Sequence, residues 1–321
     1  MSKKTKIWLM VAASLILTGL IIFAVVMTVL KWDFRMLSTF KYETNEHVIT
    51  EEFKNITVIG RTENIVFLPS DNSEIKVICY EQEKLRHVVS VKNGTLVIEL
   101  KDERKWYEHI GINFSTSKLT IYLPNGKYGD LNVKSSTGDV KISGDLQFNI
   151  INVSLSTGSI KNSASASGSV KLRTSTGFIS VENINAASLD LLVTTGDVKV
   201  LGANIEGDVI VKVSTGDCKL TNVKCDNVIS GGNTGDLKMT NVIAEGTFAI
   251  KRSTGDVELR MCDANDIEIT TDTGDVKGTL LTEKIFFAKS DTGSVEVPES
   301  VFGGRCKITT DTGDIRISIA D

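Results

Sequence analysis

The most constraining feature of this sequence is a motif that recurs ten times with a period of 19 or 20 residues. Each copy has a threonine followed by a glycine, and the residue before the threonine is Ser, Thr, Asn or Asp. Those side chains can bond the backbone two residues on, and glycine adopts turn conformations that other residues avoid. Such a regular period is typical of solenoids and repeat arrays. The motif glycines are Gly138, Gly158, Gly177, Gly196, Gly216, Gly235, Gly255, Gly274, Gly293 and Gly313.

Apolar residues alternate with polar ones on both sides of each turn, as Val140 and Ile142 do after Gly138. This period of two is the pattern of β-strands. Each repeat therefore offers two short strands and a corner, with its apolar groups on one side. One coil cannot bury that side alone, whereas stacked coils bury it in a continuous column. We predict an all-β fold: a single-stranded parallel β-solenoid of about ten coils over residues 131–321, on the order of 48 Å long at a strand spacing of about 4.8 Å.

Residues 43–130 also have the pattern of β-strands, and we expect them to form an N-terminal β module. Asn93-Gly94 is a hairpin signal between two of the predicted strands. An open solenoid end would expose a sheet edge, so we expect this module to cap the near end of the stack. The predicted strands are Ile56–Ile59, Ile75–Tyr80, Val88–Val91, Leu96–Leu100 and Leu119–Leu123.

One stretch of this module, residues 101–109, mixes charges with two aromatic residues. That combination can mark a recognition loop. An exposed hairpin loop that folds its aromatic rings onto the module would explain the same residues. The candidate recognition residues are Arg104, Lys105, Trp106, Tyr107 and His109.

A run of 24 residues without a charge, 7–30, predicts one transmembrane helix. As a helix it would be about 36 Å long, which is enough to cross a hydrocarbon core of about 30 Å with some tilt. Lysines in the tail, residues 1–6, favour a cytoplasmic N-terminus. The run is longer than the apolar region of a cleaved signal peptide, so we predict an uncleaved signal anchor in a bacterial cell membrane. Residues 31–42 would link this single-pass anchor to an extracytoplasmic domain.

The residue after the motif glycine is Asp in seven of the ten repeats, and a mostly basic column follows two residues later. We expect a solvated stripe in which neighbouring opposite charges offset the repulsion between stacked carboxylates. The alternative is a calcium site, because oxygen-rich turns with paired carboxylates can hold a hard cation. The candidate calcium ligands are Asp272, Asp275, Asp291, Asp311 and Asp314.

The residue types that most enzymes require are scarce in the repeats. No His, Tyr or Trp occurs after residue 130, and the constant step leaves no room for inserted loops. We therefore expect no enzyme, no catalytic residues and no cofactor, with calcium as the open exception. The formal net charge of -4 makes nucleic acid an unexpected partner. The three histidines, His47, His87 and His109, are expected to face solvent rather than bind a metal.

The five cysteines form no Cys-x-x-Cys pair, and two of them stand where other repeats carry Val, Ile or Leu. We expect buried thiols that pack as small apolar residues. The alternative is a disulfide or a reactive thiol. The five are Cys79, Cys218, Cys225, Cys262 and Cys306.

The N-terminal anchor, the β module ending in Ile121-Tyr122-Leu123-Pro124 and the serial Thr-Gly-Asp-Val coils resemble the bacterial "putative adhesin" family, including LiaG-type proteins of cell-envelope stress operons. The resemblance covers roughly residues 43–321. It implies an extracytoplasmic, membrane-tethered protein linked to surface contact or envelope stress, with cell-envelope components or other proteins as partners. The alternatives are a bactofilin-like structural protein that stacks end to end near Ile315–Ile319 and, less favoured, a polysaccharide-acting enzyme.

Overall fold

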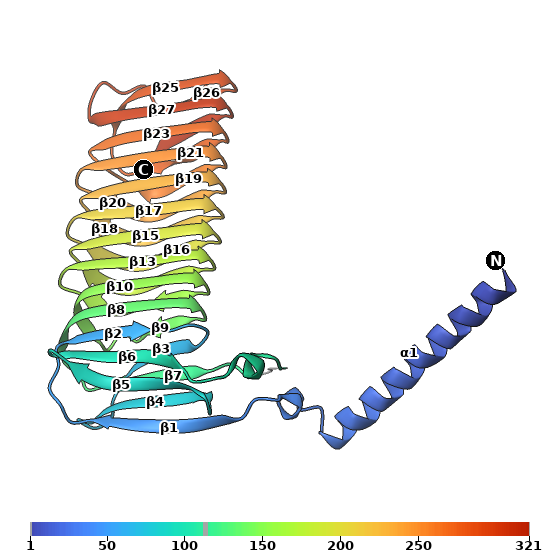
Figure 1. The fold of residues 1–321 in the computed structure, drawn as a ribbon. Coiled ribbons are helices and arrows are strands. Elements are labelled where there is room, and N and C mark those ends of the chain that lie inside the picture. Colours follow the sequence, from blue (N-terminus) through green and yellow to red (C-terminus); the bar gives the residue numbers. More distant parts are fainter. Residues whose placement is uncertain (1, 112–114, 321) are drawn as a thin grey trace.

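The computed structural model describes residues 2–111 and 115–320, so Met1, residues 112–114 and Asp321 lie outside the described part. It shows a parallel β-solenoid preceded by an apolar helix, α1 (Lys3–Val29), and a short 3-10 helix, η1 (Phe34–Leu37) (Figure 1). By length and composition α1 could cross a membrane, since its most apolar window has a mean hydropathy of 2.8. The fold class predicted from the repeats is therefore confirmed.

Each repeat forms one coil, in which a first strand ends at the motif threonine and a second strand begins two residues after the glycine. The first strands are β8 (Lys127–Thr137), β10 (Gln147–Thr157), β13 (Ser169–Thr176), β15 (Ser188–Thr195), β17 (Asp208–Thr215), β19 (Asn227–Thr234), β21 (Thr247–Thr254), β23 (Asp266–Thr273), β25 (Lys284–Thr292) and β27 (Gly304–Thr312). The second strands are β9 (Val140–Ile142), β11 (Ile160–Asn162), β14 (Ile179–Ala186), β16 (Val198–Ile205), β18 (Cys218–Cys225), β20 (Leu237–Ala244), β22 (Val257–Cys262), β24 (Val276–Leu280), β26 (Val295–Glu296) and β28 (Ile315–Ile319). The short β12 (Ser165–Ala166) pairs with the start of β10.

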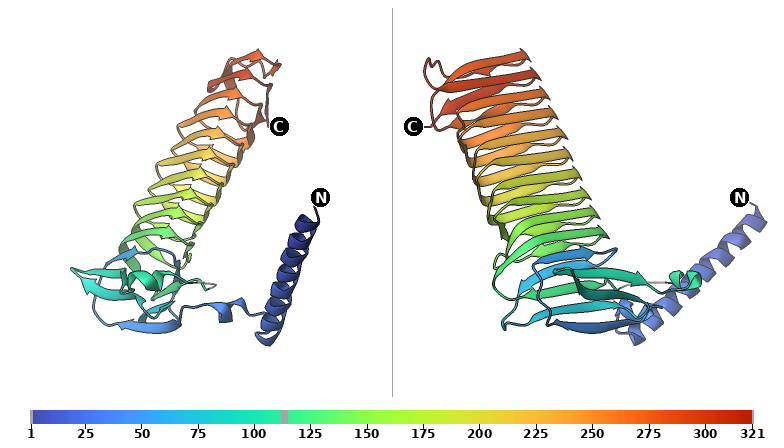
Figure 2. Two further views of the ribbon diagram at one scale, coloured as in Figure 1. Left: turned by 45° about the vertical axis from the view of Figure 1, so that its right-hand side comes forward. Right: turned by 60° about the vertical axis from the view of Figure 1, so that its left-hand side comes forward.

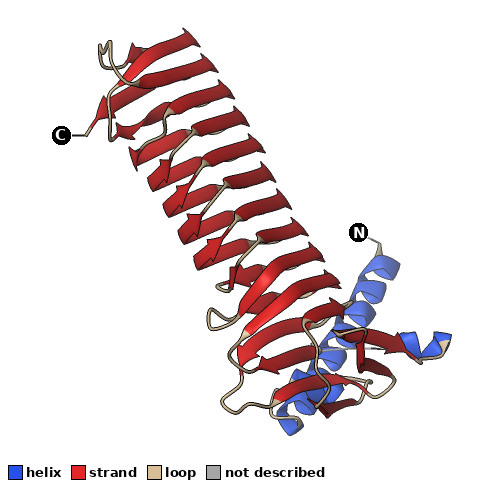
Figure 3. Ribbon diagram, turned by 90° about the vertical axis from the view of Figure 1, so that its left-hand side faces the viewer, coloured by secondary structure: helices blue, strands red, loops and turns tan. Residues whose placement is uncertain are grey.

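Neighbouring coils pair in parallel and in register, so equivalent residues of successive repeats lie above one another (Figure 3). Leu172, Leu191 and Val211, for example, form consecutive rungs and are fully buried. A continuous apolar column therefore runs through the stack, as the alternating pattern predicts. Burying one such side chain contributes about 1.5–3 kcal/mol relative to leaving it exposed.

The motif glycines form a column of their own at the turn between the two strands. Their φ angles lie between +115° and +151°, a region that residues with a Cβ avoid. Each glycine also lies against the backbone of the next coil. The Gly235 N–H donates to the Thr254 carbonyl at 2.9 Å, and a Cβ on Gly235 would lie 2.1 Å from the Gly216 oxygen. Both the backbone conformation and the close approach therefore require glycine here.

The corner within the longer second strands uses a left-handed residue that the repeat pattern does not reveal. Asn183, Asn222 and Asn241 have φ angles of 53–54°, and Gly202 and Met261 occupy the equivalent corners with φ of 69° and 52°. Asparagine tolerates this conformation better than most residues do. The Asn241 side chain also donates to Asn222 at 2.9 Å, which links successive corners.

The N-terminal β module extends the parallel stack as well as capping it. The strands before the first repeat are β1 (Tyr42–Ile49), β2 (Asn55–Ile59), β3 (Asn64–Pro69), β4 (Ile75–Gln82), β5 (Leu85–Lys92), β6 (Thr95–Asp102) and β7 (Lys118–Leu123). β2 pairs in parallel with β8 and β6, and β3 pairs in parallel with β9 and β7. Parallel coils therefore continue below residue 131, in an order that differs from the order of the sequence.

Antiparallel strands close this end of the stack. β5 pairs with β6, and β4 pairs with β7 and with β1. The parallel strand edges that the lowest coil would present are thus covered (Figure 1). Such a cover blocks edge-to-edge association, which explains why the module precedes the repeats.

The two last coils exchange places at the distal end. β27 pairs with β23 on one side and β25 on the other, and β28 pairs with β24 and β26. The final coil of the sequence is therefore enclosed, and β25–β26 forms the end of the stack (Figure 2). The prediction that residues Ile315–Ile319 form a stacking end is wrong, because β28 is paired on both sides.

The chain between β26 and β27 explains how this exchange is possible. β26 stops before Pro298, which cannot donate to a strand ladder. Gly303 then adopts a φ of +94°, and a Cβ on Gly304 would lie 1.6 Å from the Asn265 oxygen. The glycines let the chain step back and lie directly against the coil of β23.

Candidate functional surfaces and a buried polar cluster

The candidate recognition loop follows β6 and contains the 3-10 helix η2 (Trp106–His109). Its aromatic rings are outside the core: Trp106 is 78% exposed and Tyr107 is 49% exposed. The two rings meet edge to face, with their centroids 5.9 Å apart. The loop is thus an exposed projection. The alternative interpretation, in which the aromatic rings fold onto the module, does not describe it.

Polar contacts hold the base of this loop. Arg104 donates to both oxygens of Asp102 at 2.7 and 2.8 Å, and Glu108 accepts the Lys105 N–H at 2.8 Å while it also pairs with Lys84. Between the loop and the segment that follows η1 lies an open hollow of about 290 Å³. The hollow is lined by Thr39, Phe40, Lys41, Gln82, Glu83, Lys84, Arg104, Glu108 and Ile110.

The aspartates after the motif glycines form a hydrogen-bonded ladder between coils. Asp217 accepts the Asp236 N–H at 2.9 Å, and its own N–H donates to Asp197 at 2.9 Å. Asn64 makes the same contact with the Asp139 N–H in the N-terminal module. Each aspartate of the column therefore satisfies one backbone N–H of the neighbouring coil. This role explains the repeated Asp better than a stripe of ion pairs does. In the described part of the chain, one ion pair joins the acidic and basic columns, Arg316 with Asp314.

The candidate calcium ligands lie on the three most distal coils. Because of the exchange, the Asp311–Asp314 turn lies between the turns of Asp272–Asp275 and Asp291. The carboxylates of Asp275 and Asp314 accept the N–H groups of Asp314 and Ser294. Within residues 2–111 and 115–320, these aspartates are not brought together as three ligand atoms within 4.8 Å.

The distal coil carries a group of exposed apolar side chains, which we call the distal apolar patch. Its strand β25 pairs with β27 and leaves its other edge open within the described residues. Ile285 and Phe287 occupy outward positions of β25, beside the inward Phe286 and Ala288, whereas Val301 and Phe302 lie in the loop before β27. The patch consists of Ile285, Phe287, Val295, Val301 and Phe302, which are 37%, 58%, 41%, 77% and 72% exposed.

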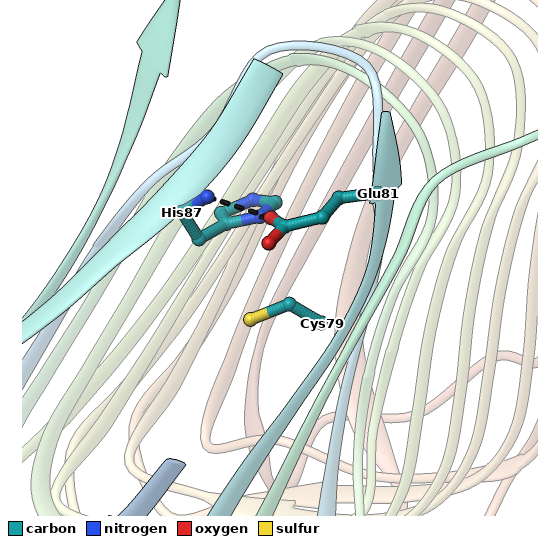
Figure 4. Close-up of side chains that lie close together, drawn as sticks. All are labelled: Cys79, Glu81 and His87. Carbon is teal, nitrogen blue, oxygen red and sulfur yellow. Dashed lines mark hydrogen bonds and ion pairs between the residues drawn. The ribbon is translucent and has the colours of Figure 1, made fainter. Parts of the chain in front are cut away.

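A second feature that the sequence did not reveal is a buried polar cluster in the N-terminal module (Figure 4). Cys79 and Glu81 point to the same side of β4, and His87 faces them from β5. One ligand atom from each of the three lies within 4.8 Å of the others, and all three residues are buried. The expectation that His87 faces solvent is therefore wrong, because the β4–β5 hairpin turns it into the cap.

Glu63, from the turn between β2 and β3, completes this cluster. Its Oε1 lies 3.5 Å from His87 Nε2, while Glu81 Oε2 lies 2.5 Å from His87 Nδ1. Burial alone would lower the pKa of His87, but the groups of Cys79, Glu63 and Glu81 outweigh burial and raise it to about 11. Although burial opposes it, His87 lowers the pKa of both Glu63 and Glu81. The two carboxylates thus flank the His87 ring, one at each nitrogen, and favour its protonated form.

Another buried polar group is Arg252, which is fully buried inside the solenoid. Its Nη2 donates to Ser230 at 3.0 Å, whereas Nε and Nη1 make no hydrogen bond with the described residues. Burial lowers its pKa. The guanidinium occupies space that Gly232 leaves open, since a Cβ there would lie 1.7 Å from Nη1. A small residue in one coil therefore accommodates a large one in the next.

Apart from Cys79 in the polar cluster, the cysteines pack as small apolar residues, as expected. All five are buried and none is in a disulfide in the described part of the chain. Burial raises the pKa of Cys218, Cys225 and Cys306 to about 12, which keeps these thiols protonated and unreactive.

These features define a class of protein: a capped parallel β-solenoid behind an apolar N-terminal helix. The chain belongs to the Toastrack DUF4097 family, which matches residues 53–209 and 202–321. This match confirms the resemblance stated from the Thr-Gly-Asp coils. No curated protein matches the sequence.

Several solved structures are similar to this chain. A "putative adhesin" from Bacteroides fragilis is 17% identical, with 87% of this chain and 97% of that chain covered and a TM-score of 0.38. A "putative adhesin" from Parabacteroides distasonis is 12% identical, with 88% and 98% covered and a TM-score of 0.40. A "putative lipid binding protein" from the same species is 16% identical, with 88% and 98% covered and a TM-score of 0.27. Identities and scores this low leave the family match as the basis of the assignment.

Proposed function

We propose that this protein is a non-enzymatic bacterial surface protein in which α1 anchors the chain in the cell membrane and the solenoid carries a binding surface away from it. The observation that carries the proposal is the distal apolar patch, which lies at the end of the stack opposite the cap (Figure 1). Exposed apolar groups gathered in one place mark interaction sites more often than scattered ones do. The name "putative adhesin" of two of the similar structures fits a role in adhesion.

Membrane topology follows from this proposal and can be measured by cysteine labelling. The five natural cysteines are buried, so a new exposed cysteine supplies the reactive thiol. In intact cells that produce the full chain, we expect a membrane-impermeant maleimide to label Ser73→Cys, in the exposed β3–β4 loop, and to leave Ser2→Cys unlabelled until the membrane is opened. The reverse pattern would place the solenoid in the cytoplasm and end the proposal.

The role of the distal apolar patch can be tested with the same cells. We expect Phe287→Ser with Phe302→Ser to reduce attachment to surfaces coated with cell-wall, lipid or envelope-protein fractions severalfold. Trp106→Ser is the matched control, because Trp106 is as exposed as Phe302 but lies at the opposite end. A loss with the control variant alone would move the binding surface to the Trp106 loop.

End-to-end self-association is the second candidate, and the open edge of β25 favours it. It uses the same patch and differs in its partner, which is a second copy of the chain. Sedimentation of the full chain in detergent distinguishes the two. A concentration-independent monomer that still attaches through the patch supports surface binding, whereas larger species that Phe287→Ser with Phe302→Ser converts to monomers support the structural role.

A further inference from the structure

The buried cluster of Cys79, Glu81, His87 and Glu63 has the composition of a metal site. Thiolate and imidazole are ligands that zinc and similar first-row cations accept, and carboxylates complete many such sets. The single sulfur makes calcium and magnesium poor occupants, because these cations prefer oxygen ligands. We propose that Cys79, Glu81 and His87 bind one divalent cation of the zinc class within the cap, with Glu63 beside them.

The positions of the atoms support this assignment. Ligand atoms of Cys79, Glu81 and His87 already lie within 4.8 Å of one another, and Glu63 Oε1 is 3.5 Å from His87 Nε2. Ligands of a tetrahedral zinc ion stand about 2.0–2.3 Å from the metal, so small inward movements would bring the three side chains to coordinating distance. His87 Nε2 is buried and has Glu63 Oε1 as its polar neighbour.

The surroundings already orient the ligands as a metal site requires. Glu81 Oε2 accepts the His87 backbone N–H at 2.6 Å, and Asn45 donates to Glu81 Oε1 at 2.8 Å. The N–H groups of Arg61 and Thr62 donate to Glu63 at 2.8–3.1 Å. Partners of this kind fix ligand direction and typically change metal affinity by about 10–100-fold when removed.

Metal ligands bind in their deprotonated forms, so binding would release the Cys79 thiol proton, and any proton on the ligating His87 nitrogen, to solvent. Binding would tie β4 to β5 and so stabilise the antiparallel cap. This inference is independent of the role proposed for the distal apolar patch.

Cobalt binding to the full chain in detergent tests the site, since Co²⁺ replaces zinc and reports its ligands by absorption. After treatment with a chelator, we expect the wild-type protein to take up one equivalent of Co²⁺ with tetrahedral visible bands and a thiolate charge-transfer band, and zinc to displace it. Cys79→Ser should lose the thiolate band and His87→Gln should bind at least tenfold more weakly. Cys225→Ser, a buried cysteine in β18, should behave as wild type.

The outcome does not depend on whether the variants fold. Wild-type protein that keeps its β-sheet circular dichroism in chelator and binds no Co²⁺ overturns the proposal. So does a thiolate band that persists in Cys79→Ser, because the sulfur ligand would then lie elsewhere. An increase of the wild-type thermal midpoint on adding zinc, with no increase in a folded Cys79→Ser or His87→Gln variant, supports a structural site.

Discussion

Replacing Gly235 with alanine is expected to lower the thermal midpoint by about 4–12 °C, which corresponds to about 2–3 kcal/mol for a domain of this size. Two penalties combine. The φ of +125° is strained for alanine, at about 1–3 kcal/mol, and its Cβ would lie 2.1 Å from the Gly216 oxygen. The coils cannot separate locally without breaking the hydrogen bond from the Gly235 N–H to Thr254. Thermal unfolding followed by circular dichroism measures the effect.

Gly231→Ala is the matched control, because Gly231 lies in β19, the strand that leads into the Gly235 turn, with no atom within 4 Å of the added methyl group and no positive φ. We expect this variant to unfold within about 1 °C of wild type or slightly above it, since alanine reduces the entropy of the unfolded chain. Equal destabilisation by the two substitutions would contradict the account of the glycine column.

Gly232→Val is expected to destabilise the protein by about 3 kcal/mol, because valine would occupy the space of the Arg252 guanidinium. Val213 occupies the equivalent position one coil earlier, so valine itself suits the column. The cost arises from overpacking and from separating a buried charge from Ser230. Denaturant unfolding measures the loss.

Arg252→Thr should rescue this variant. Threonine is the residue of the next coil, Thr271, in the same column, and it leaves room for the valine. We expect the double variant to recover about 2 kcal/mol relative to the sum of the single effects, as contacting residues that share one space do. Additive effects would show that Gly232 and Arg252 are not coupled.

The architecture was predictable because the same chemistry is repeated in every coil. A threonine and glycine close each turn, and alternating apolar residues assign each strand an inner and an outer face. The order of the coils was not predictable for the same reason. β25 and β27 carry similar patterns, so the sequence does not distinguish which of them pairs with β23. Loop glycines such as Gly303 determine which strand pairs with β23. Their effect depends on contacts with the neighbouring coil, which the sequence does not show.

The candidate sites were harder to predict because they combine residues from separate elements. His87 and Glu63 approach each other only when the hairpin of β4 and β5 closes over the β2–β3 turn. The sequence offered one signal for this cluster, a polar residue at an inward position of a strand. The same signal marks Arg252, which lies opposite Gly232. The exposure of Trp106 and Tyr107 was predicted as one of two alternatives, and their role in recognition stays a prediction.

The exchange of the last two coils has a consequence for synthesis and export. Once the N-terminal module has formed, a chain that emerges from its N-terminus can add coils one at a time from β8 to β24, because each new coil finds its support already built. β25 and β26 then emerge before the coil on which they rest. The distal apolar patch therefore takes its final form only after residues 304–319 have been delivered and inserted beneath it. A chain interrupted before that point has a capped base and a growing stack, but its distal coil is incomplete. The distal apolar patch is therefore exposed in its final form only on chains in which residues 304–319 have been added.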